Sequence, residues 1–101
     1  LMMEQKFDKA LEKYNKAITL FPIDYAYFNR GNAKLNLKDY KGALADYDKT
    51  ISLNPEYATA FLQRGITKIN MGDPINGCID LKTARKLNSP GAGDALKKYC
   101  K

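Results

Sequence analysis

The sequence predicts an all-α fold, an α-solenoid built from stacked antiparallel helix pairs. Three observations predict it. The same residue pattern returns along the chain at a nearly constant offset. Apolar residues recur three and four positions apart, as in "ALADYDKTI", which is the periodicity of a helix with one buried face, and no segment has the alternation of a strand. The offset is about 34 residues, a period typical of stacked supersecondary units that share one core.

The repetition runs through both helices of a unit. In the first helix an aromatic, an arginine and a glycine return one period later: Tyr27, Arg30 and Gly31 recur as Phe61, Arg64 and Gly65. In the second helix three positions align in three copies: Phe7, Tyr40 and Pro74; Ala10, Ala43 and Gly77; Tyr14, Tyr47 and Leu81. Each unit is therefore expected to be a helix, a tight turn and a second helix.

The first two of six expected helices cover residues 6–20 and 25–37. The amphipathic pattern of the first begins directly in "LMMEQKF", without a preceding capping residue, so we expect the chain to be a piece of a longer one. Pro22 separates the two helices because its missing amide and its ring clash stop a helix.

The third and fourth helices are expected over residues 40–53 and 58–71. Asp39 can accept hydrogen bonds from the amides of the turn that it opens, and Pro55 ends the third helix. Gly72 supplies the left-handed residue that ends the fourth.

The fifth helix is expected over residues 74–87, with Asp73 as its cap and Pro74 at its first position. The sixth, over residues 92–100, follows Pro90. It places Ala95, Leu96 and Tyr99 toward the core and Lys97, Lys98 and Lys101 toward water, as a helix that closes a stack requires.

These units resemble the tetratricopeptide repeat (TPR). That family has a helix-turn-helix unit of about 34 residues with an aromatic and a small residue in the first helix, a small residue and an aromatic in the second, and a closing proline. The slots hold Tyr27, Gly31, Ala43, Tyr47, Thr50 and Pro55 in one unit and Phe61, Gly65, Gly77, Leu81, Ala84 and Ser89-Pro90 in the next. The resemblance implies a single domain with a partial repeat over 1–23, repeats over 24–57 and 58–90, and a capping helix over 91–101.

The chain also departs from the family pattern. Most of the first helix of the first unit is absent. Arg30 and Arg64 stand where leucine is usual, and Lys34 and Lys68 stand where an aromatic is usual. Armadillo and HEAT units are longer, whereas pentatricopeptide repeats, which bind RNA, have a similar length.

Small residues are expected where helices approach closely. Gly31 and Gly65 should let the second helix of the same unit press in with its aromatic, and Ala43 and Gly77 should let two helices cross. No glycine pattern of a phosphate-binding loop is present, so we interpret these glycines as structural.

The composition argues against an enzyme. Without histidine there is no ordinary catalytic triad and no histidine metal cage, and we expect neither a cofactor nor a metal. Asp46, Asp48 and Asp80 are interpreted as residues of exposed helix faces and caps. The net charge of +6 comes from 17 basic and 11 acidic residues, but the two signs are interleaved and form no basic arm.

Cys78 and Cys100 lie far apart along the chain and match no zinc, haem or redox spacing. We interpret Cys78 as a small core residue and Cys100 as a free thiol, with a disulfide between them as the alternative. Free thiols favour a reducing compartment such as the cytoplasm. No apolar run approaches the roughly 18 residues that would span a bilayer, and no signal-peptide pattern is present.

The resemblance implies a scaffold that binds a partner peptide or protein on a concave groove lined by the first helix of each unit. The expected groove residues are Phe28, Asn29, Asn32, Leu35, Asn36, Thr59, Leu62, Gln63, Ile66, Ile69 and Asn70. An asparagine amide can both donate to and accept from a peptide backbone, while leucine and isoleucine offer shallow pockets. The alternative is that the asparagines are only solvated and that the apolar residues complete the core.

One specialised form of this function is not expected. Family members that grip the acidic carboxy-terminus of chaperones use a clamp of lysine, asparagine and arginine. Asn29 matches its middle asparagine, but Thr59 and Gln63 occupy the slots of the third helix, and the first helix is absent.

Two other functions compete with peptide binding. A nucleic acid could contact the cations Lys34, Lys38, Lys41, Lys68, Lys82, Arg85 and Lys86, but these do not interleave with exposed aromatics and fall on several helix faces. Self-association as a homodimer or an end-to-end stack could use the first helix, through Leu11, Tyr14 and Ile18 with Leu1, Met2 and Met3.

Overall fold

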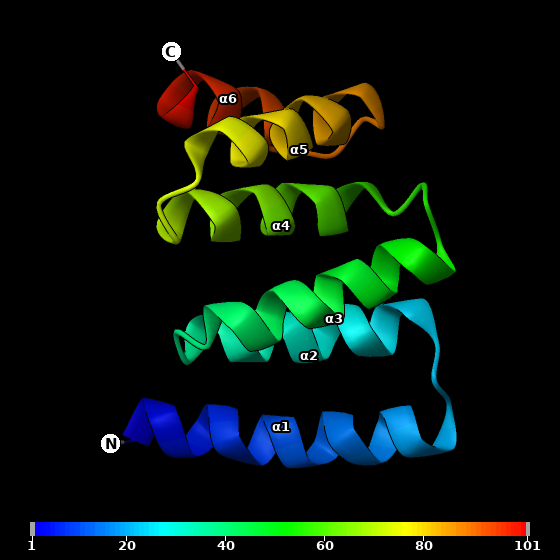
Figure 1. Cartoon of the computed structure of the whole chain (residues 1–101). Coiled ribbons are helices and arrows are strands. Elements are labelled where there is room, and N and C mark those ends of the chain that lie inside the picture. Colours follow the sequence, from blue (N-terminus) through cyan, green and yellow to red (C-terminus); the bar gives the residue numbers. More distant parts are fainter. Residues whose placement is uncertain (1, 101) are drawn as a thin grey trace.

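The computed structural model describes the backbone of residues 2–100 and the side chains of residues 9–100, and over that range the chain forms α-helices and no strand (Figure 1). The helices are α1 (Met2–Leu20), α2 (Asp24–Asn36), α3 (Tyr40–Leu53), α4 (Ala58–Asn70), α5 (Pro74–Lys86) and α6 (Ala92–Tyr99). The all-α class is confirmed, and the expected boundaries agree within one residue except at the start of α1. None of the described helices is both long and apolar enough to cross a membrane.

The helices stack in the order of the chain. α2 packs on α3 and α4 packs on α5, which gives two complete pairs, while α1 packs on α2, α3 on α4, and α6 on α5. The two ends of the chain lie at opposite ends of this stack, with α1 at the bottom of the view and α5 and α6 at the top (Figure 1). Such a one-dimensional arrangement is that of an α-solenoid, as expected.

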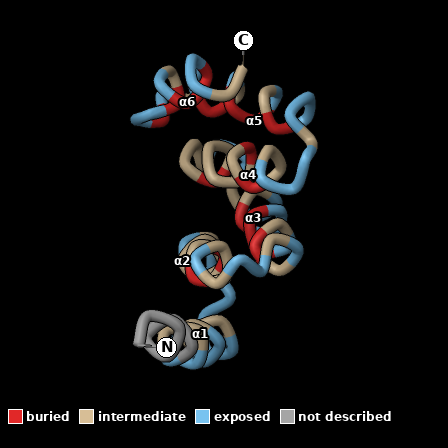
Figure 2. Tube along the Cα trace, turned by 90° about the vertical axis from the view of Figure 1, so that its left-hand side faces the viewer, coloured by how far each residue is buried: buried red, intermediate tan, exposed pale blue. Residues whose placement is uncertain are grey.

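The stack curves toward the side of α2, α4 and α6. α2 contacts α4 and α4 contacts α6, whereas α3 contacts neither α1 nor α5 in the described part of the chain. Figure 2 shows α2 and α6 on the left of the view and α3 and α5 on the right. Because successive helices lie closer together on the inside of a curve, the layer of α2, α4 and α6 is the inner, concave layer.

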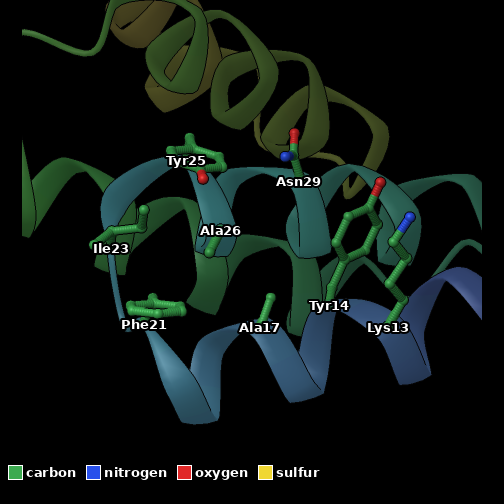
Figure 3. Close-up of a pocket in the computed structure, with 8 residues that line it drawn as sticks. All are labelled: Lys13, Tyr14, Ala17, Phe21, Ile23, Tyr25, Ala26 and Asn29. Carbon is green, nitrogen blue, oxygen red and sulfur yellow. The ribbon is translucent and has the colours of Figure 1, made fainter.

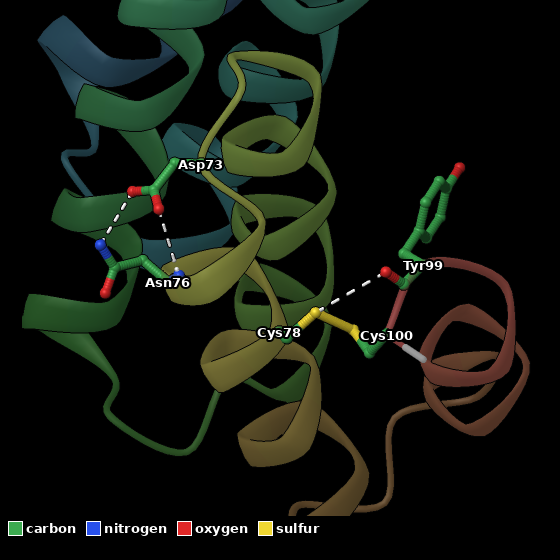
Figure 4. The surroundings of a disulfide bond; sticks show 5 residues. All are labelled: Asp73, Asn76, Cys78, Tyr99 and Cys100. Atoms are coloured by element: carbon green, nitrogen blue, oxygen red, sulfur yellow. Dashed lines mark hydrogen bonds between the residues drawn. A yellow bond between two sulfur atoms is a disulfide. The ribbon is translucent and has the colours of Figure 1, made fainter.

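The capping signals act as the sequence predicts. The Asp39 side chain accepts from the amide of Gly42 at 3.0 Å, and Asp73 accepts from the amide of Asn76 at 3.3 Å. Asn76 Nδ2 adds a second hydrogen bond to Asp73 at 2.8 Å (Figure 4), and these hydrogen bonds lower the pKa of the Asp73 carboxyl. Gly72 has the expected left-handed conformation, with φ of +88°.

The core runs between the two layers. Tyr47 and Leu81, which are equivalent in the repeat, are both fully buried, as are Ala43 and Ala84. At the carboxy-terminal end Leu81 packs with Ala95 and Leu96 of α6. The expected inward face of the last helix is therefore confirmed. Lys97 and Lys98 are exposed as expected, and Lys101 lies outside the described residues.

Close approach at the glycines is confirmed as well. A Cβ added at Gly31 would lie 2.8 Å from Cε1 of Tyr47. At the crossing of α4 and α5, a Cβ added at Gly65 would lie 2.7 Å from the carbonyl oxygen of Gly77, and one added at Gly77 would lie 2.7 Å from that of Gly65. Two glycine backbones thus touch where any larger residue would force α4 and α5 apart.

The interpretation of the cysteines as free thiols was wrong. Cys78 of α5 and Cys100, directly after α6, form a disulfide with their Cα atoms 5.9 Å apart (Figure 4). The packing of α6 on α5 brings the two residues together, and their sequence spacing alone does not reveal this. The inference of a reducing compartment rested on free thiols and loses its basis.

Candidate functional site

The inner layer carries the eleven residues that the sequence assigns to a groove. We call them the inner surface: Phe28, Asn29, Asn32, Leu35, Asn36, Thr59, Leu62, Gln63, Ile66, Ile69 and Asn70. Five come from α2 and six from α4, and these two helices contact each other. Asn36 and Asn70 are exposed, and the other nine are partly buried.

The apolar members on α4 belong in part to the core. Leu62, Ile66 and Ile69 pack against the cluster of Leu81 and Leu96. All three are partly buried, so for them the alternative interpretation, that the apolar residues complete the core, is supported, whereas their part in binding stays a prediction.

Phe28 is held in an aromatic cluster. Its ring centroid lies 5.8 Å from that of Tyr47 and 5.0 Å from that of Tyr57, in tilted arrangements. Tilted aromatic contacts at these distances are attractive and fix the ring. Phe28 therefore contributes a rigid edge to the inner surface.

Asn32 is the centre of a hydrogen-bond network. Its Oδ1 accepts from the hydroxyl of Tyr47 at 2.5 Å and from Nε2 of Gln63 at 3.2 Å. Burial raises the pKa of Tyr47 above its ordinary value, and the neighbouring Asp46 raises it further. The network joins α2, α3 and α4, so Asn32 and Gln63 hold the inner layer together and are less available to a ligand than the sequence suggests.

Asn29 and Asn36 line a pocket at the α1 end of the inner surface. This pocket has a volume of about 170 Å³ and also contains Tyr14 of α1. Tyr14, which the sequence analysis also places on the possible self-association face, is partly buried in this structure and stands in register with the buried Tyr47.

Two equivalent ion-pair clusters lie between the layers, and sequence reasoning missed both. Arg30 Nη2 lies 2.7 Å from Asp46 Oδ1, and Lys34 Nζ lies 3.2 Å from Asp46 Oδ2. In the next unit Arg64 Nε and Lys68 Nζ lie 2.8 and 2.9 Å from Asp80 Oδ2. The available signal was that the arginine, the lysine and the aspartate of each cluster all recur at the same offset in the repeat.

The interpretation of Asp46 and Asp80 as exposed residues was therefore wrong. They are only 2% and 3% exposed, because each lies where its helix packs on the preceding one. Their hydrogen bonds raise the pKa of Arg30 and Arg64, so both guanidinium groups stay charged. Lys34 and Lys68, considered for contacts with nucleic acid, are occupied by these aspartates.

The comparisons with known proteins agree with the repeat geometry. The profile of the Tetratricopeptide repeat family matches residues 25–57. The chain is 29% identical over 98 residues to small glutamine-rich tetratricopeptide repeat-containing protein 2 of Saccharomyces cerevisiae, covering 96% of this chain and 28% of that protein. It is 36% identical over 86 residues to Hsc70-interacting protein 1 of Drosophila melanogaster, covering 84% of this chain and 23% of that protein. The chain thus spans about a quarter of the length of these relatives.

Solved structures of TPR domains superpose on nearly the whole chain. The first TPR domain of Spaghetti (RPAP3), bound to the HSP90 peptide SRMEEVD, has a TM-score of 0.87 and 26% identity, covering 94% of this chain and 78% of that one. The second TPR domain of human RPAP3, in complex with the HSP70 peptide SGPTIEEVD, has a TM-score of 0.86 and 28% identity, covering 97% and 84%. The repeated helix pairs, the family profile and these structures together establish that the chain belongs to the tetratricopeptide repeat family.

Proposed function

We propose that this chain is a non-catalytic interaction module that binds an extended segment of a partner protein along the inner surface of α2 and α4. Two similar TPR structures hold peptides, and one similar relative is named for its interaction with Hsc70, which supports a protein or peptide partner. The observation that carries the proposal is the pair Asn36 and Asn70. Both are exposed, both end their helices, and they occupy the same register of the repeat.

The chemistry of these side chains suits an extended backbone. A peptide strand presents an N–H donor and a C=O acceptor at each residue, and an asparagine amide can meet both. Leu35, one position before Asn36, and Ile69, one position before Asn70, supply apolar contacts beside each amide. The repeat therefore offers one amide and one apolar side chain per unit to successive parts of a ligand.

The proposed partner segment is not an acidic chaperone tail. Such a tail needs cations that pair with its carboxylates. Thr59 and Gln63 stand where the clamp has lysine and arginine, and Nε2 of Gln63 donates to Asn32. Lys34 and Lys68 pair with Asp46 and Asp80 instead. We therefore expect SRMEEVD and SGPTIEEVD to bind at least about tenfold more weakly than a peptide selected from a random library.

A selection followed by a charged double variant tests the proposal. Peptides are selected on the native chain, and their affinity is measured by fluorescence anisotropy. Asn36→Arg with Asn70→Arg should weaken binding at least about tenfold, because arginine is bulkier than asparagine and offers no acceptor for a backbone N–H. These positions are chosen over Asn32 because the hydrogen bonds of Asn32 to Tyr47 and Gln63 make it part of the fold.

The matched control adds the same charge to the outer layer. Ser52→Arg with Ile79→Arg changes exposed residues of α3 and α5 and should leave the affinity unchanged. If both double variants bind alike, or if the outer one alone loses binding, the inner surface is not the peptide site.

Self-association through α1 is a second candidate, favoured by an exposed apolar end of that helix. Leu20 and Phe21 are 72% and 66% exposed, and Leu11, Tyr14 and Ile18 are partly buried. Leu1, Met2 and Met3 lie outside the residues whose side chains the structure describes. Light scattering at about 100 µM should then show a dimer or larger species, since mass action favours association at high concentration; a strictly monomeric mass contradicts it.

A further inference from the structure

The outer side of α5 carries a row of exposed residues that is apolar at one end and basic at the other. The spacings of four, three and four residues place them on one face of the helix: Ile75, Ile79, Lys82 and Lys86. We call this row the α5 stripe. All four residues are exposed, and the two isoleucines expose 76% and 55% of their surface. The stripe belongs to the outer layer of α3 and α5, not to the inner surface on α2 and α4 (Figure 2).

The internal repeat shows that this composition is particular to α5. The equivalent positions of α3 hold a cation, a small residue, an anion and a hydroxyl: Lys41, Ala45, Asp48 and Ser52. They are also exposed, but their charges are mixed and none has a large apolar side chain. In α1, Glu12 and Asn15 stand where α5 has Ile79 and Lys82. The packing of the stack therefore does not require isoleucines at these positions.

The repeat also shows that neighbouring helices leave such a stripe open. α3 is followed by α4 and α5, yet its four equivalent positions stay exposed, and α3 does not contact α5 in the described part of the chain. A helix packed on α6 as α5 packs on α4 would therefore not cover the α5 stripe.

The pocket between α1 and α2 differs in this respect (Figure 3). Tyr14 and Ala17, which line it, are equivalent to Tyr47 and Thr50, and these two residues contact α2. The repeat thus fills that kind of position with a helix of the stack itself.

A hollow adjoins the α5 stripe where α5 meets the end of α6. It has a volume of about 600 Å³, and Ile75, Ile79 and Lys82 line it from α5 while Tyr99 lines it from α6. The disulfide between α5 and the residue after α6 also lines the hollow (Figure 4). This covalent link holds the two walls together, so the hollow is formed before a ligand arrives.

The chemistry of the stripe and its hollow favours one kind of occupant. Lys82 lines the hollow and Lys86 follows it on the stripe, whereas none of the described residues that line the hollow carries a carboxylate. A segment with an apolar side chain beside the isoleucines and carboxylates beside the lysines complements both halves of the stripe. The flat surface of a bilayer would not fill the hollow, and a nucleic acid would pair with the lysines and leave the isoleucines uncovered.

We propose that the α5 stripe and its hollow bind an acidic segment of a partner protein, which inserts a bulky apolar side chain beside Ile75 and Ile79 and pairs its carboxylates with Lys82 and Lys86. This is a second interaction surface, on the outer layer. It goes beyond the proposed function and does not depend on it, because it shares no residue with the inner surface.

Three short peptides separate the contributions of charge and apolar contact. GEELLEEG has both features, GEESSEEG keeps the charge without the leucines, and GKKLLKKG keeps the leucines with the opposite charge. Binding is followed by NMR at peptide concentrations up to about 1 mM, since so small a contact should be weak. GEELLEEG should shift the amide signals of Ile75, Ile79, Lys82 and Tyr99 and bind at least about fivefold more tightly than the other two peptides.

Variants of the stripe test each contact against a control on α3. Ile79→Ser should weaken the binding of GEELLEEG at least about threefold, whereas Ala45→Ser, at the equivalent position, should not. Lys82→Glu should weaken GEELLEEG and strengthen GKKLLKKG by about threefold or more, whereas Lys41→Glu should do neither. All four positions are exposed, so the variants should fold, which circular dichroism verifies.

Three results overturn the proposal. The first is that GEELLEEG binds no more tightly than GEESSEEG or does not bind, and the second is an equal response to the stripe variants and their α3 controls. The third is a different occupant. A change of the same amide signals with protein concentration alone would identify a second copy, and co-sedimentation with phosphatidylserine vesicles that Ile79→Ser abolishes would identify a membrane.

The inner surface supplies the last control. Asn36→Arg with Asn70→Arg should leave the response of the α5 stripe to GEELLEEG intact, so failure of this proposal and failure of the proposed function are distinguishable.

Discussion

The contact between Arg30 and Asp46 joins three successive helices. Asp46 is 2% exposed, and its carboxylate accepts from both Nε and Nη2 of Arg30, while Lys34 approaches Oδ2. Arg30 also donates to Asn15 of α1 at 3.0 Å, so a single arginine joins α1, α2 and α3. Arg64 does the same in the next unit with Asp48 and Asp80.

Removing Asp46 should be costly. Asp46→Ala leaves Arg30 and Lys34 partly buried without their carboxylate, and we expect a loss of about 3 kcal/mol in the free energy of unfolding, measured with urea. The triple variant that adds Arg30→Leu and Lys34→Tyr restores the apolar residues usual in the family and should recover most of that loss. If the triple variant is as unstable as Asp46→Ala, the loss of stability does not come from the unpaired charges of Arg30 and Lys34.

The raised pKa of Tyr47 predicts a loss of stability in alkaline solution. Its pKa is raised in the folded state, mainly by burial, so the folded chain keeps the proton that the unfolded chain releases above about pH 10. The contribution of Tyr47 to stability is therefore fully present below about pH 10 and declines as the pH rises beyond it.

Urea unfolding at several pH values measures this effect. At neutral pH Tyr47→Phe should be less stable by about 1 kcal/mol through the lost hydrogen bond to Asn32, and the difference from the native chain should shrink above about pH 10. Tyr25→Phe, at an exposed position, is the control and should run parallel to the native chain. A difference for Tyr47→Phe that stays constant with pH would contradict the assignment.

For single residues, the sequence predicted the features that follow from the repeat pattern. It missed the contacts that depend on which sides of two helices face each other. The burial of Tyr47 and the role of Gly31 follow from their positions in the repeat. The pairing of Arg30 with Asp46 requires knowing which side of α3 meets α2. The disulfide between Cys78 and Cys100 likewise requires the packing of α6 on α5.

At the scale of elements, the crossing of α4 and α5 brings two helix backbones into contact. The backbones of Gly65 and Gly77 meet there, and a Cβ at either position would approach the other's carbonyl oxygen at 2.7 Å. A backbone cannot yield as a side chain can, whereas at Gly31 the nearest atom belongs to the ring of Tyr47.

Substitution of these glycines by alanine should rank the contacts by the stability that each variant loses. Gly65→Ala should destabilise the chain by about 2 to 3 kcal/mol, and Gly31→Ala by less, because the Tyr47 ring can shift. Gly93→Ala is the control within α6: apart from its chain neighbours and its own helix backbone, no atom lies within 4 Å of the added Cβ. This variant should be neutral or gain up to about 1 kcal/mol from helix propensity. Thermal unfolding of the three variants gives the order, and equal losses at all three positions would refute the steric explanation.

The boundaries of these elements were largely predictable because capping residues and prolines mark them locally. Asp39, Asp73 and Pro74 lie at the helix starts that they predict. From the sequence, the inner surface could be predicted only as one face of α2 and α4, without the role of each residue on it. Asn36 and Asn70 are exposed there, whereas Asn32 and Ile66 make contacts that stabilise the fold. This difference depends on contacts between helices, which no local sequence signal encodes.

For the whole molecule, the disulfide fastens the last helix to the stack. Cys78 and Cys100 enclose a segment that contains α6 and its link to α5. In the loop-entropy account, a loop of this length contributes about 3 kcal/mol by restricting the unfolded chain. α6 also covers part of Leu81 and of the apolar residues of α4, so its attachment protects the carboxy-terminal core.

Reduction should therefore weaken the domain. Dithiothreitol is expected to lower the free energy of unfolding by about 3 kcal/mol. The variant Cys78→Ser with Cys100→Ser should match the reduced chain and should not respond to the reductant. An unchanged stability on reduction, with loss of the disulfide verified by mass spectrometry, would show that packing alone holds α6.

In the proposed function the curved stack binds a partner segment with its inner layer. NMR chemical-shift mapping of the native chain with a peptide selected on it tests this binding directly. The largest amide shifts should fall on α2 and α4, at Asn36, Asn70 and their neighbours Leu35 and Ile69. Shifts confined to the outer helices α3 and α5 would contradict it.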